Sequence, residues 1–206
     1  MEKGLFITFE GIDGCGKSTQ IGLLESYLKE KGKEVLLIRE PGGTAVGEKI
    51  REILLEKKND SMKPLTELLL FEAARAQITE EKIIPATEAG KVVICDRFFD
   101  STTAYQGYAR EMGTELTDLL NGIATAGRSP DITFVLDIDP EQAYARRVGR
   151  GGEEDRMEAL GLLFQQKVRE GYLKLASDNP RVRVIDASAT PEEISEQIKG
   201  MIDNVI

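Results

Sequence analysis

The chain has 206 residues, 41% of them hydrophobic and 31% charged, and it carries a formal net charge of −9 at pH 7. This size and balance predict a single globular domain over residues 1–206 with an apolar core. The negative charge disfavours a nucleic-acid-binding protein, since such domains are usually basic, and the absence of histidine excludes histidine triads and histidine-bound zinc.

In chain order, short apolar runs alternate with segments that have helical spacing. The runs at residues 4–10, 34–40, 91–96, 131–138 and 182–187 predict five buried strands. Helical patterns follow the first two strands, extend from Pro64 to about residue 89, and close the chain from Pro191 onward. Apolar strands separated by helices predict an α/β fold with a parallel sheet covered on both faces.

Polar residues follow three of these strands at the point where each strand ends. Asp13 comes after the first strand, Arg39 and Glu40 after the second, and Asp96 and Arg97 after the third. Right-handed crossovers bring the carboxyl ends of parallel strands to one edge of the sheet. Open α/β sheets bind their ligands at that edge, so we expect a site there.

The stretch GIDGCGKST has the spacing of a phosphate-binding loop, Gly11-x-x-x-x-Gly16-Lys17-Ser18. Its glycines let the backbone turn N–H groups toward phosphate oxygens, and the helix that follows adds its positive end. We expect Lys17 to reach the β- and γ-phosphates of ATP or GTP, and the Ser18 hydroxyl to bind Mg²⁺. The expected triphosphate contacts are Gly11, Ile12, Asp13, Gly14, Cys15, Gly16, Lys17, Ser18 and Thr19.

The residues around this loop narrow the class of protein. The chain has no Asn-Lys pair, which disfavours a GTPase, and it has no obvious assembly element of a motor ATPase. Its surplus of arginines suits two phosphate-bearing ligands, because charge on a transferred phosphoryl group must be neutralised. In VVICDRF, Asp96 resembles the carboxylate that holds magnesium or its water, with Arg97 beside it. A structural ion pair at the strand end is the alternative.

Other candidate contacts also have a structural alternative. Phe71 and Arg75 share a helix face and suit a stacked, hydrogen-bonded nucleobase, although a phenylalanine there is more often core. Residues 101–106 gather hydroxyls, an aromatic ring and an amide, which suit a base and a sugar or simply begin a helix. Arg51 alone would be a solvated charge. The stretch 146–156 is charged and interrupted by glycines, which predicts a mobile loop. Its arginines could close over the triphosphate, or the loop could simply be a solvated basic stretch.

Cysteine usage and hydropathy indicate the compartment. Cys15 and Cys95 lie far apart, and we expect free thiols in a reducing environment. The chain start has no secretory leader pattern, and no apolar run approaches the length that spans a membrane. We therefore expect a cytoplasmic protein with neither a membrane nor a nucleic acid as partner.

Five motifs together resemble one family. TFEGIDGCGKST, REPGGT, LLLFEAARAQ, CDRFFDSTTAYQGYAR and PDITFVLDI occur in the order typical of thymidylate kinases, and the likeness spans nearly the whole chain. The resemblance implies the P-loop nucleoside monophosphate kinase fold, a five-stranded parallel sheet with helices on both faces and a mobile lid at about residues 146–157. It implies transfer of the γ-phosphoryl group of ATP to dTMP with Mg²⁺, giving dTDP in dTTP biosynthesis. It also implies a homodimer packed through helices beside the sheet.

The resemblance assigns roles to individual residues. The implied catalytic residues are Lys17, Asp13, Arg97 and Arg150, and the implied metal ligands are Ser18 and Asp96. The implied dTMP contacts are Phe71 stacked on thymine; Arg75, Gln106 and Thr102 at the base; Tyr105 against the deoxyribose C2′; Arg51 and Arg97 on the phosphate; and Asp13 and Glu40 beside it. The Glu40–Pro41 bond is implied to be cis.

Gly14 marks a departure within the family, because some members carry an arginine at this place in the loop. The resemblance implies that members without it take the charge from the lid, here from Arg146 and Arg150, with Arg147 as a further candidate. Adenine contacts are implied at the lid base and around Ala187. A dTMP phosphate is already anionic at neutral pH, so transfer needs no general base, which fits a chain without histidine.

Two other functions stay open at this point. One is a P-loop kinase with a different acceptor, such as a deoxynucleoside or another nucleoside monophosphate. The other is a nucleotide-binding regulator that has lost catalysis. Phosphate transfer to dTMP, dUMP, UMP and CMP distinguishes the first, and ATP turnover with and without dTMP distinguishes the second. Acceptance of dUMP is open as well.

Overall fold

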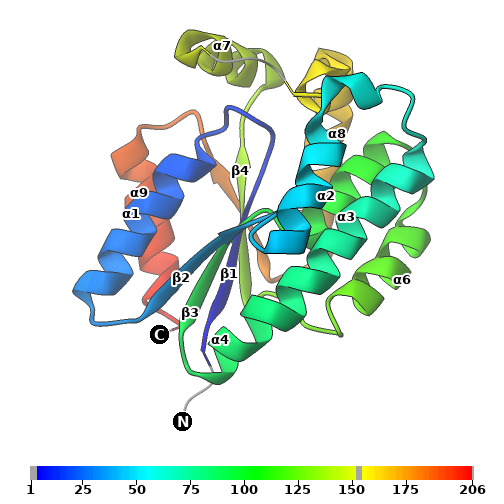
Figure 1. The fold of residues 1–206 in the computed structure, drawn as a ribbon. Coiled ribbons are helices and arrows are strands. Elements are labelled where there is room, and N and C mark those ends of the chain that lie inside the picture. The colour runs from blue at the N-terminus through cyan, green and yellow to red at the C-terminus, as the bar shows by residue number, and fades with distance from the viewer. Residues whose placement is uncertain (1–3, 152–154, 206) are drawn as a thin grey trace.

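The computed structural model describes residues 4–151 and 155–205, except for the side chain of Arg150. Its described residues form one five-stranded sheet in the order β2-β3-β1-β4-β5 (Figure 1). All the neighbouring strands are parallel, so the predicted parallel sheet is confirmed. The strands are β1 (Phe6–Glu10), β2 (Val35–Arg39), β3 (Val92–Asp96), β4 (Ile132–Asp137) and β5 (Val182–Asp186).

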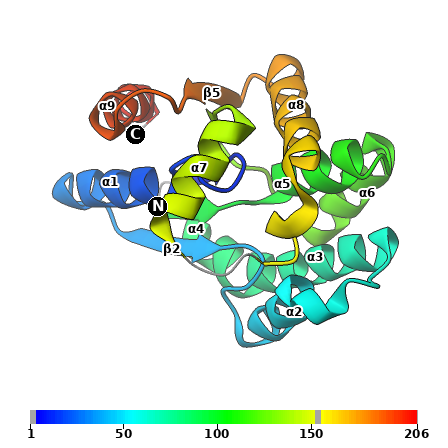
Figure 2. The same ribbon diagram turned by 90° about the horizontal axis from the view of Figure 1, so that it is seen from above.

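Helices cover both faces of the sheet, as predicted. One face carries α1 (Lys17–Glu30) and α9 (Pro191–Ile202), which pack against each other (Figure 2). The other helices are α2 (Ala45–Leu55), α3 (Pro64–Ile78), α4 (Ile84–Glu88), α5 (Phe99–Thr102), α6 (Thr114–Ala124), α7 (Pro140–Arg150) and α8 (Leu162–Asp178). Short 3₁₀ turns occupy Lys57–Asn59 and Glu158–Leu160. No helix in the described ranges is long and apolar enough to cross a membrane.

The three central strands, β1, β3 and β4, are buried because both of their faces meet helices. The edge strands β2 and β5 each leave at least two residues exposed, so the prediction of buried strands is wrong for these two. All five residues of β1 are buried, and Phe9 packs on Phe134 of β4 with ring centroids 5.4 Å apart. The register pairs Phe9 with Asp96, which ends β3. The loop after β1 and the residues after β3 therefore emerge side by side at the carboxyl edge of the sheet.

The predicted helical stretch after Pro64 is continuous but not uniform. α3 and α4 are joined by a π-helical turn at Thr79–Ile83, and a second π-helical segment, Thr103–Ala109, follows α5. Such wider turns are rare and are often found at functional sites. The second one carries two of the expected substrate contacts, Tyr105 and Gln106.

The expectation of an irregular loop over residues 146–156 is wrong for its first half. α7 extends to Arg150, so Arg146, Arg147 and the backbone of Arg150 are helical. The helix begins at Pro140, and the Asp139 side chain caps it by accepting a hydrogen bond of 2.9 Å from the Glu141 N–H. The capped start helps to offset Gly149 in the helix interior, which costs about 1 kcal/mol of helix stability. The helix ends at Gly151, where φ is 70°.

Candidate active site

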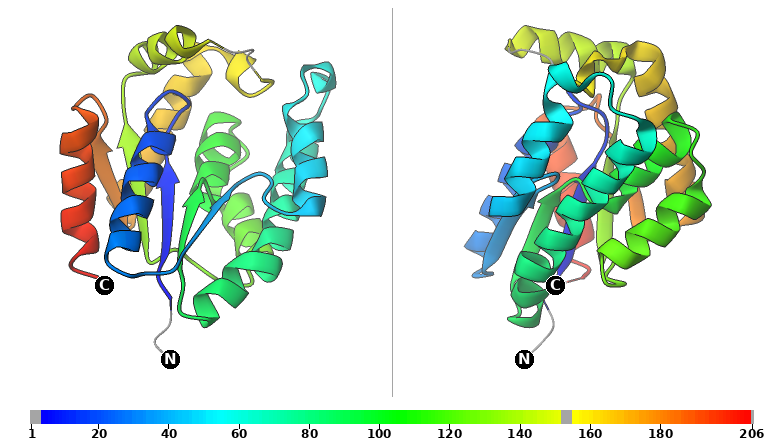
Figure 3. Two further views of the ribbon diagram at one scale, coloured as in Figure 1. Left: turned by 60° about the vertical axis from the view of Figure 1, so that its left-hand side comes forward. Right: turned by 45° about the vertical axis from the view of Figure 1, so that its right-hand side comes forward.

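The loop after β1 has the geometry of a phosphate cradle. Gly11, Gly14 and Gly16 have φ values of 129°, 91° and 101°, which L-residues rarely adopt. A Cβ on Gly14 would lie 2.2 Å from the Ala143 carbonyl oxygen, so the loop packs directly against α7. Figure 3 shows the loop, in blue, beneath α7. No side chain fits at this position, which explains why the chain carries a glycine there.

The Lys17 ammonium group lies within this loop. It donates to the carbonyl oxygens of Gly11 at 3.0 Å and Ile12 at 3.3 Å, and it lies 3.8 Å from the Asp13 carboxylate. Backbone oxygens and one carboxylate hold the charge in place at the opening of α1. The rest of the predicted loop follows: Ile12 and Cys15 are buried, and Thr19 donates through its N–H to the Gly16 carbonyl.

The residues proposed from sequence as metal ligands share a cavity with the loop. Ser18 and Asp96 both line it, together with Lys17. The Asp96 Oδ1 atom is buried and accepts no hydrogen bond from the described residues. Nowhere in residues 4–151 and 155–205 do three His, Cys, Asp or Glu side chains gather as a metal cluster. One hydroxyl and one carboxylate oxygen suit a cation that takes its other ligands from phosphate and water, as Mg²⁺ does.

Arg97 binds the loop from the β3 side. Its backbone adopts φ 68°, and its guanidinium donates to Asp13 at 2.8 Å, to Ser101 at 3.2 Å and to the Tyr172 hydroxyl at 3.1 Å. Burial alone would raise the Asp13 pKa, but the charges of Arg97 and Lys17 lower it to about 2. Asp13 is therefore ionised and Arg97 remains charged at neutral pH.

A second layer of polar residues supports Arg97. The fully buried Glu10 carboxylate accepts hydrogen bonds from the Ser101 hydroxyl at 2.6 Å, from Tyr172 at 2.9 Å and from the Phe98 N–H at 2.7 Å. Sequence reasoning missed Glu10 and Tyr172. A charged residue at the end of an otherwise apolar strand is a signal for Glu10. No local signal existed for Tyr172, which comes from α8.

The expected base contacts line a second cavity. Its wall includes Phe71, Arg75, Thr102, Tyr105 and Gln106. They come from α3, α5 and the π-helical segment Thr103–Ala109, so three separate elements contribute. An aromatic ring, a guanidinium, a hydroxyl and an amide at one cavity are suited to a planar heterocycle with polar edges.

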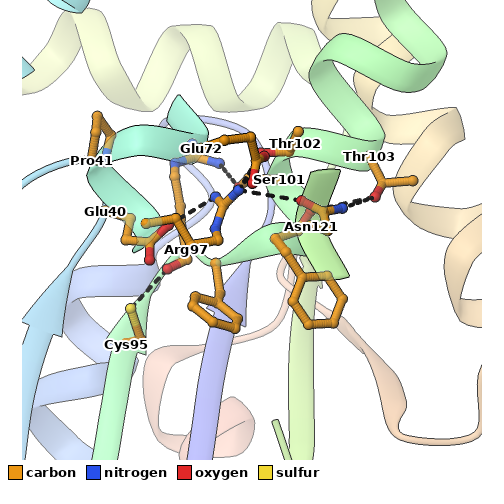
Figure 4. Close-up of polar contacts among 12 residues, drawn as sticks. Glu40, Pro41, Glu72, Cys95, Arg97, Ser101, Thr102, Thr103 and Asn121 are labelled. Atoms are coloured by element: carbon orange, nitrogen blue, oxygen red, sulfur yellow. Dashed lines mark hydrogen bonds and ion pairs between the residues drawn. The ribbon is translucent and has the colours of Figure 1, made fainter. Parts of the chain in front are cut away.

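The guanidinium of Arg75 is fixed by an extensive polar network, whose members Glu40, Glu72, Thr102 and Asn121 are labelled in Figure 4. Its Nη2 atom lies 2.8 Å from Glu40, while Nη1 lies 2.6 Å from Glu72, 2.8 Å from Thr102 and 3.3 Å from Asn121. Burial raises the Glu40 pKa to about 7, although Arg75 beside it opposes the rise. Glu72 and Asn121 were not among the predicted residues. The Glu40–Pro41 bond is cis, as predicted.

Four residues belong to both cavities. Asp13, Glu40, Arg51 and Arg97 line the phosphate-loop cavity and the base cavity alike. Arg51 donates to the Pro41 carbonyl oxygen at 2.9 Å and is half-buried between the two. Burial and the neighbouring Arg39 lower the Arg51 pKa. The guanidinium groups of Arg51 and Arg97 therefore line the junction between the two cavities.

The structure describes only some of the predicted lid residues. Arg146 donates to the Ala187 carbonyl oxygen at 2.9 Å, which joins the middle of α7 to the loop after β5. Arg147 lies 3.8 Å from Glu158. The side chain of Arg150 and residues 152–154 of the expected lid lie outside the described residues. At the far end of the lid, Arg156 is buried and bonded to the Leu54 carbonyl oxygen at 2.7 Å.

Comparison with known proteins agrees with this geometry. A family model described as thymidylate kinase matches residues 9–198. A thymidylate kinase of Thermoanaerobacter sp. (strain X514) is 52% identical over 204 residues, covering 98% of each chain, and one of Chlorobaculum tepidum is 50% identical with 97% of each covered. The crystal structure of thymidylate kinase from Ehrlichia chaffeensis has a TM-score of 0.77 at 37% identity and covers 98% of this chain and 99% of that one. The chain therefore belongs to the thymidylate kinase family, whose reaction is the phosphorylation of dTMP to dTDP.

Proposed function

We propose that the two cavities hold the two nucleotides of this reaction, ATP over the loop after β1 and dTMP in the base cavity. The observation that carries this proposal is their junction, since Asp13, Arg51 and Arg97 line both cavities. Phosphoryl transfer requires donor and acceptor phosphates to meet in line among positive charges. A shared wall with two guanidinium groups meets that requirement.

On the donor side, Lys17 and the loop amides hold the phosphates of ATP. Ser18 and Asp96 hold Mg²⁺, which neutralises charge on the phosphates when it is bound. The unpartnered Asp96 oxygen supports this role. Adenine lies near Arg146 and Ala187, whose hydrogen bond joins the middle of α7 to the loop after β5.

On the acceptor side, the thymine ring stacks on Phe71, and its polar edge meets Arg75, Gln106 and Thr102. Tyr105 lies against the C2′ atom of the sugar and disfavours ribonucleotides. Arg51 and Arg97 bind the phosphate of dTMP. Arg97 keeps its charge through the reaction, because Asp13 and the polar groups around it raise its pKa despite burial.

Transfer proceeds without a general base, since the attacking phosphate oxygen is already anionic. The missing charge at Gly14 comes from the lid, through Arg146 and Arg150, when the lid closes and excludes water. We expect Arg150→Ala to lower kcat much more than it changes dTMP binding. An unchanged kcat would remove Arg150 from this role.

Comparing dTMP with thymidine tests the acceptor site, because the two differ only in the phosphate. Arg51→Ala should weaken dTMP binding by roughly tenfold or more and leave thymidine inhibition unchanged, since only the phosphate loses a charge-assisted partner. Phe71→Ala should weaken both ligands, because both carry the base. Equal loss of dTMP and thymidine in Arg51→Ala would show that Arg51 does not bind the phosphate.

Acceptor choice and assembly complete the proposal. Phosphate transfer should be faster to dTMP than to UMP or CMP, and a greater rate with CMP or UMP would overturn the assignment of the base cavity. The dUMP rate reports how much the thymine methyl contributes.

We also propose that the enzyme works in the cytoplasm as a homodimer, for which exposed apolar residues on α3 and α6 provide support.

A further inference from the structure

The amide of Gln106 is held in one orientation within the base cavity. Its Nε2 atom donates to the Glu67 carboxylate at 2.9 Å, and the residue is almost completely buried. Its Oε1 atom accepts no hydrogen bond within the described part of the chain, but this atom is not completely buried. Because Gln106 lines the cavity and its NH₂ group is turned to Glu67, the carbonyl oxygen is left to face the cavity.

Glu67 can only accept hydrogen bonds. Its carboxylate is 1% exposed and lies 2.6 Å from the Arg156 guanidinium and 3.0 Å from that of Arg110. Burial alone would raise the Glu67 pKa, but hydrogen bonds from Gln106, Arg110 and Arg156 lower it. An ionised carboxylate has no proton to donate, so the Gln106 amide must turn its NH₂ group toward Glu67.

This orientation distinguishes the two kinds of pyrimidine. The N3 atom of thymine or uracil carries a proton and donates, whereas N3 of cytosine is an acceptor and the neighbouring exocyclic group is a donor. A Gln106 carbonyl facing the base accepts from N3–H, and the Arg75 guanidinium donates to the adjacent carbonyl oxygen of thymine. Cytosine at the same place would set acceptor against acceptor and donor against donor, which is costly in a buried cavity.

We propose that Glu67 is a positioning residue for base specificity, which holds the Gln106 amide with its carbonyl oxygen toward the base and so selects thymine over cytosine. This inference rests on the proposed contact between Gln106 and the base. Glu67 also joins that contact to the lid, since Arg156 lies at the far end of the lid, pairs with Glu67 and donates to the Leu54 and Leu55 carbonyl oxygens.

Replacement by glutamine reverses the geometry. In Glu67→Gln, two guanidinium groups compete for the one carbonyl oxygen of the new side chain, so its NH₂ group faces Gln106. The Gln106 amide then turns over and presents its own NH₂ to the base. We therefore expect the ratio of kcat/KM for dTMP to that for 5-methyl-dCMP, which differs only at the N3–C4 edge, to fall by roughly tenfold or more.

Asp100→Asn is the matched control. Asp100 is equally buried and pairs with Arg181 through two contacts of 2.7 Å, but it does not line the base cavity. Its loss removes a buried ion pair of the same kind, and the acceptor ratio should stay within about twofold of that of the parent enzyme. A ratio in Glu67→Gln that is as high as in Asp100→Asn would overturn the inference.

Gln106→Ala separates this inference from its premise. If Gln106→Ala keeps the ratio, the base contact of Gln106 is wrong and the role of Glu67 is rejected with it. If Gln106→Ala loses the ratio and Glu67→Gln keeps it, the base contact stands and only the role of Glu67 is overturned. Should Glu67→Gln fail to fold, side-chain amide NMR of the parent enzyme decides. We expect one Gln106 NH₂ proton to be protected from hydrogen exchange, and rapid exchange of both protons would reject the proposal.

Discussion

At the residue scale, the contacts of the site converge on Arg97, which binds Asp13, Ser101 and Tyr172 through one guanidinium. A group held this firmly needs no rearrangement when charge develops on the transferred phosphoryl. We expect Arg97→Ala to lower kcat by about 10²–10³-fold, the usual loss for one preorganised donor to a transition state. Steady-state kinetics at saturating ATP and dTMP measures this.

Arg97→Lys is the informative companion, since lysine keeps the charge but lacks the planar fork. Its kcat should lie between that of Arg97→Ala and the parent enzyme. A kcat of Arg97→Ala within a few-fold of the parent value would show that Arg97 organises the loop without contributing to transfer.

The titration of Glu10 should make the stability of the protein depend on pH. Its burial raises its pKa from 4.5 to about 7, with Asp100 adding to the rise and Arg97 opposing it. The folded state therefore holds this proton more tightly than the unfolded chain does. The contribution of Glu10 to stability is fully present below about pH 4.5 and is lost as pH rises through about 7.

In Glu10→Gln this titration is absent. The free energy of unfolding of the parent enzyme, relative to that of Glu10→Gln, should fall by about 1–3 kcal/mol between about pH 5 and about pH 8. Urea unfolding of both proteins at the two pH values measures it, and other titrating groups largely cancel in the difference. A pH-independent difference would mean that Glu10 is ionised throughout.

At the element scale, the sequence patterns predicted what depends on local spacing. Apolar runs located the five strands, and the glycine spacing located the phosphate loop, because both are encoded by neighbouring residues. The helical course of Arg146 and Arg147 was missed, because charge and glycine content outweighed the Asp139–Pro140 start signal.

The supporting residues of the site were missed for a different reason. Tyr172 meets Glu10 across 162 positions of sequence, and Asn121 meets Arg75 across 46. Such contacts depend on how α6 and α8 pack, and no single-sequence pattern specifies this. The residues that line the two cavities could be predicted through family motifs, whereas the residues that hold them in place became visible only in the fold.

The packing of α8 on the π-helical segment Thr103–Ala109 gives a prediction for these elements. A Cβ on Gly171 would lie 3.0 Å from the Tyr108 Cβ and 3.2 Å from the Ala104 Cα. Because a backbone atom stands in the way, Gly171→Ala forces the two elements apart. We expect a net loss of about 1–2 kcal/mol in urea unfolding, despite better helix propensity, and a higher KM for dTMP.

Gly22→Ala is the control for helix propensity. Gly22 lies inside α1, is exposed, and would place its new Cβ with no atom within 4 Å. That variant should be more stable than the parent enzyme by about 0.5–1 kcal/mol. If Gly171→Ala were equally stabilised, α8 and the π-helical segment would not be in limiting contact.

At the scale of the whole molecule, α3 and α6 pack against each other (Figure 2), and both expose apolar side chains to solvent. Leu65 and Leu69 of α3 are 52% and 48% exposed, and Leu119 and Ile123 of α6 are 62% and 69% exposed. Each pair is spaced by four residues, so each lies along one face of its helix. The same helices carry Arg75 and Asn121 on their inner faces, so the proposed dimer surface and the base cavity share a scaffold.

We expect Leu69→Glu with Ile123→Glu to sediment as a monomer at concentrations where the parent enzyme is a dimer, because two charges per chain enter an apolar interface. Sedimentation velocity measures the mass, and Leu163→Glu is the control, since Leu163 is 86% exposed on α8. A dimer that survives the double substitution, or breaks in the control, would place the interface elsewhere. KM for dTMP should rise in the monomer, because without its partner the α3–α6 pair holds Arg75 and Asn121 less rigidly.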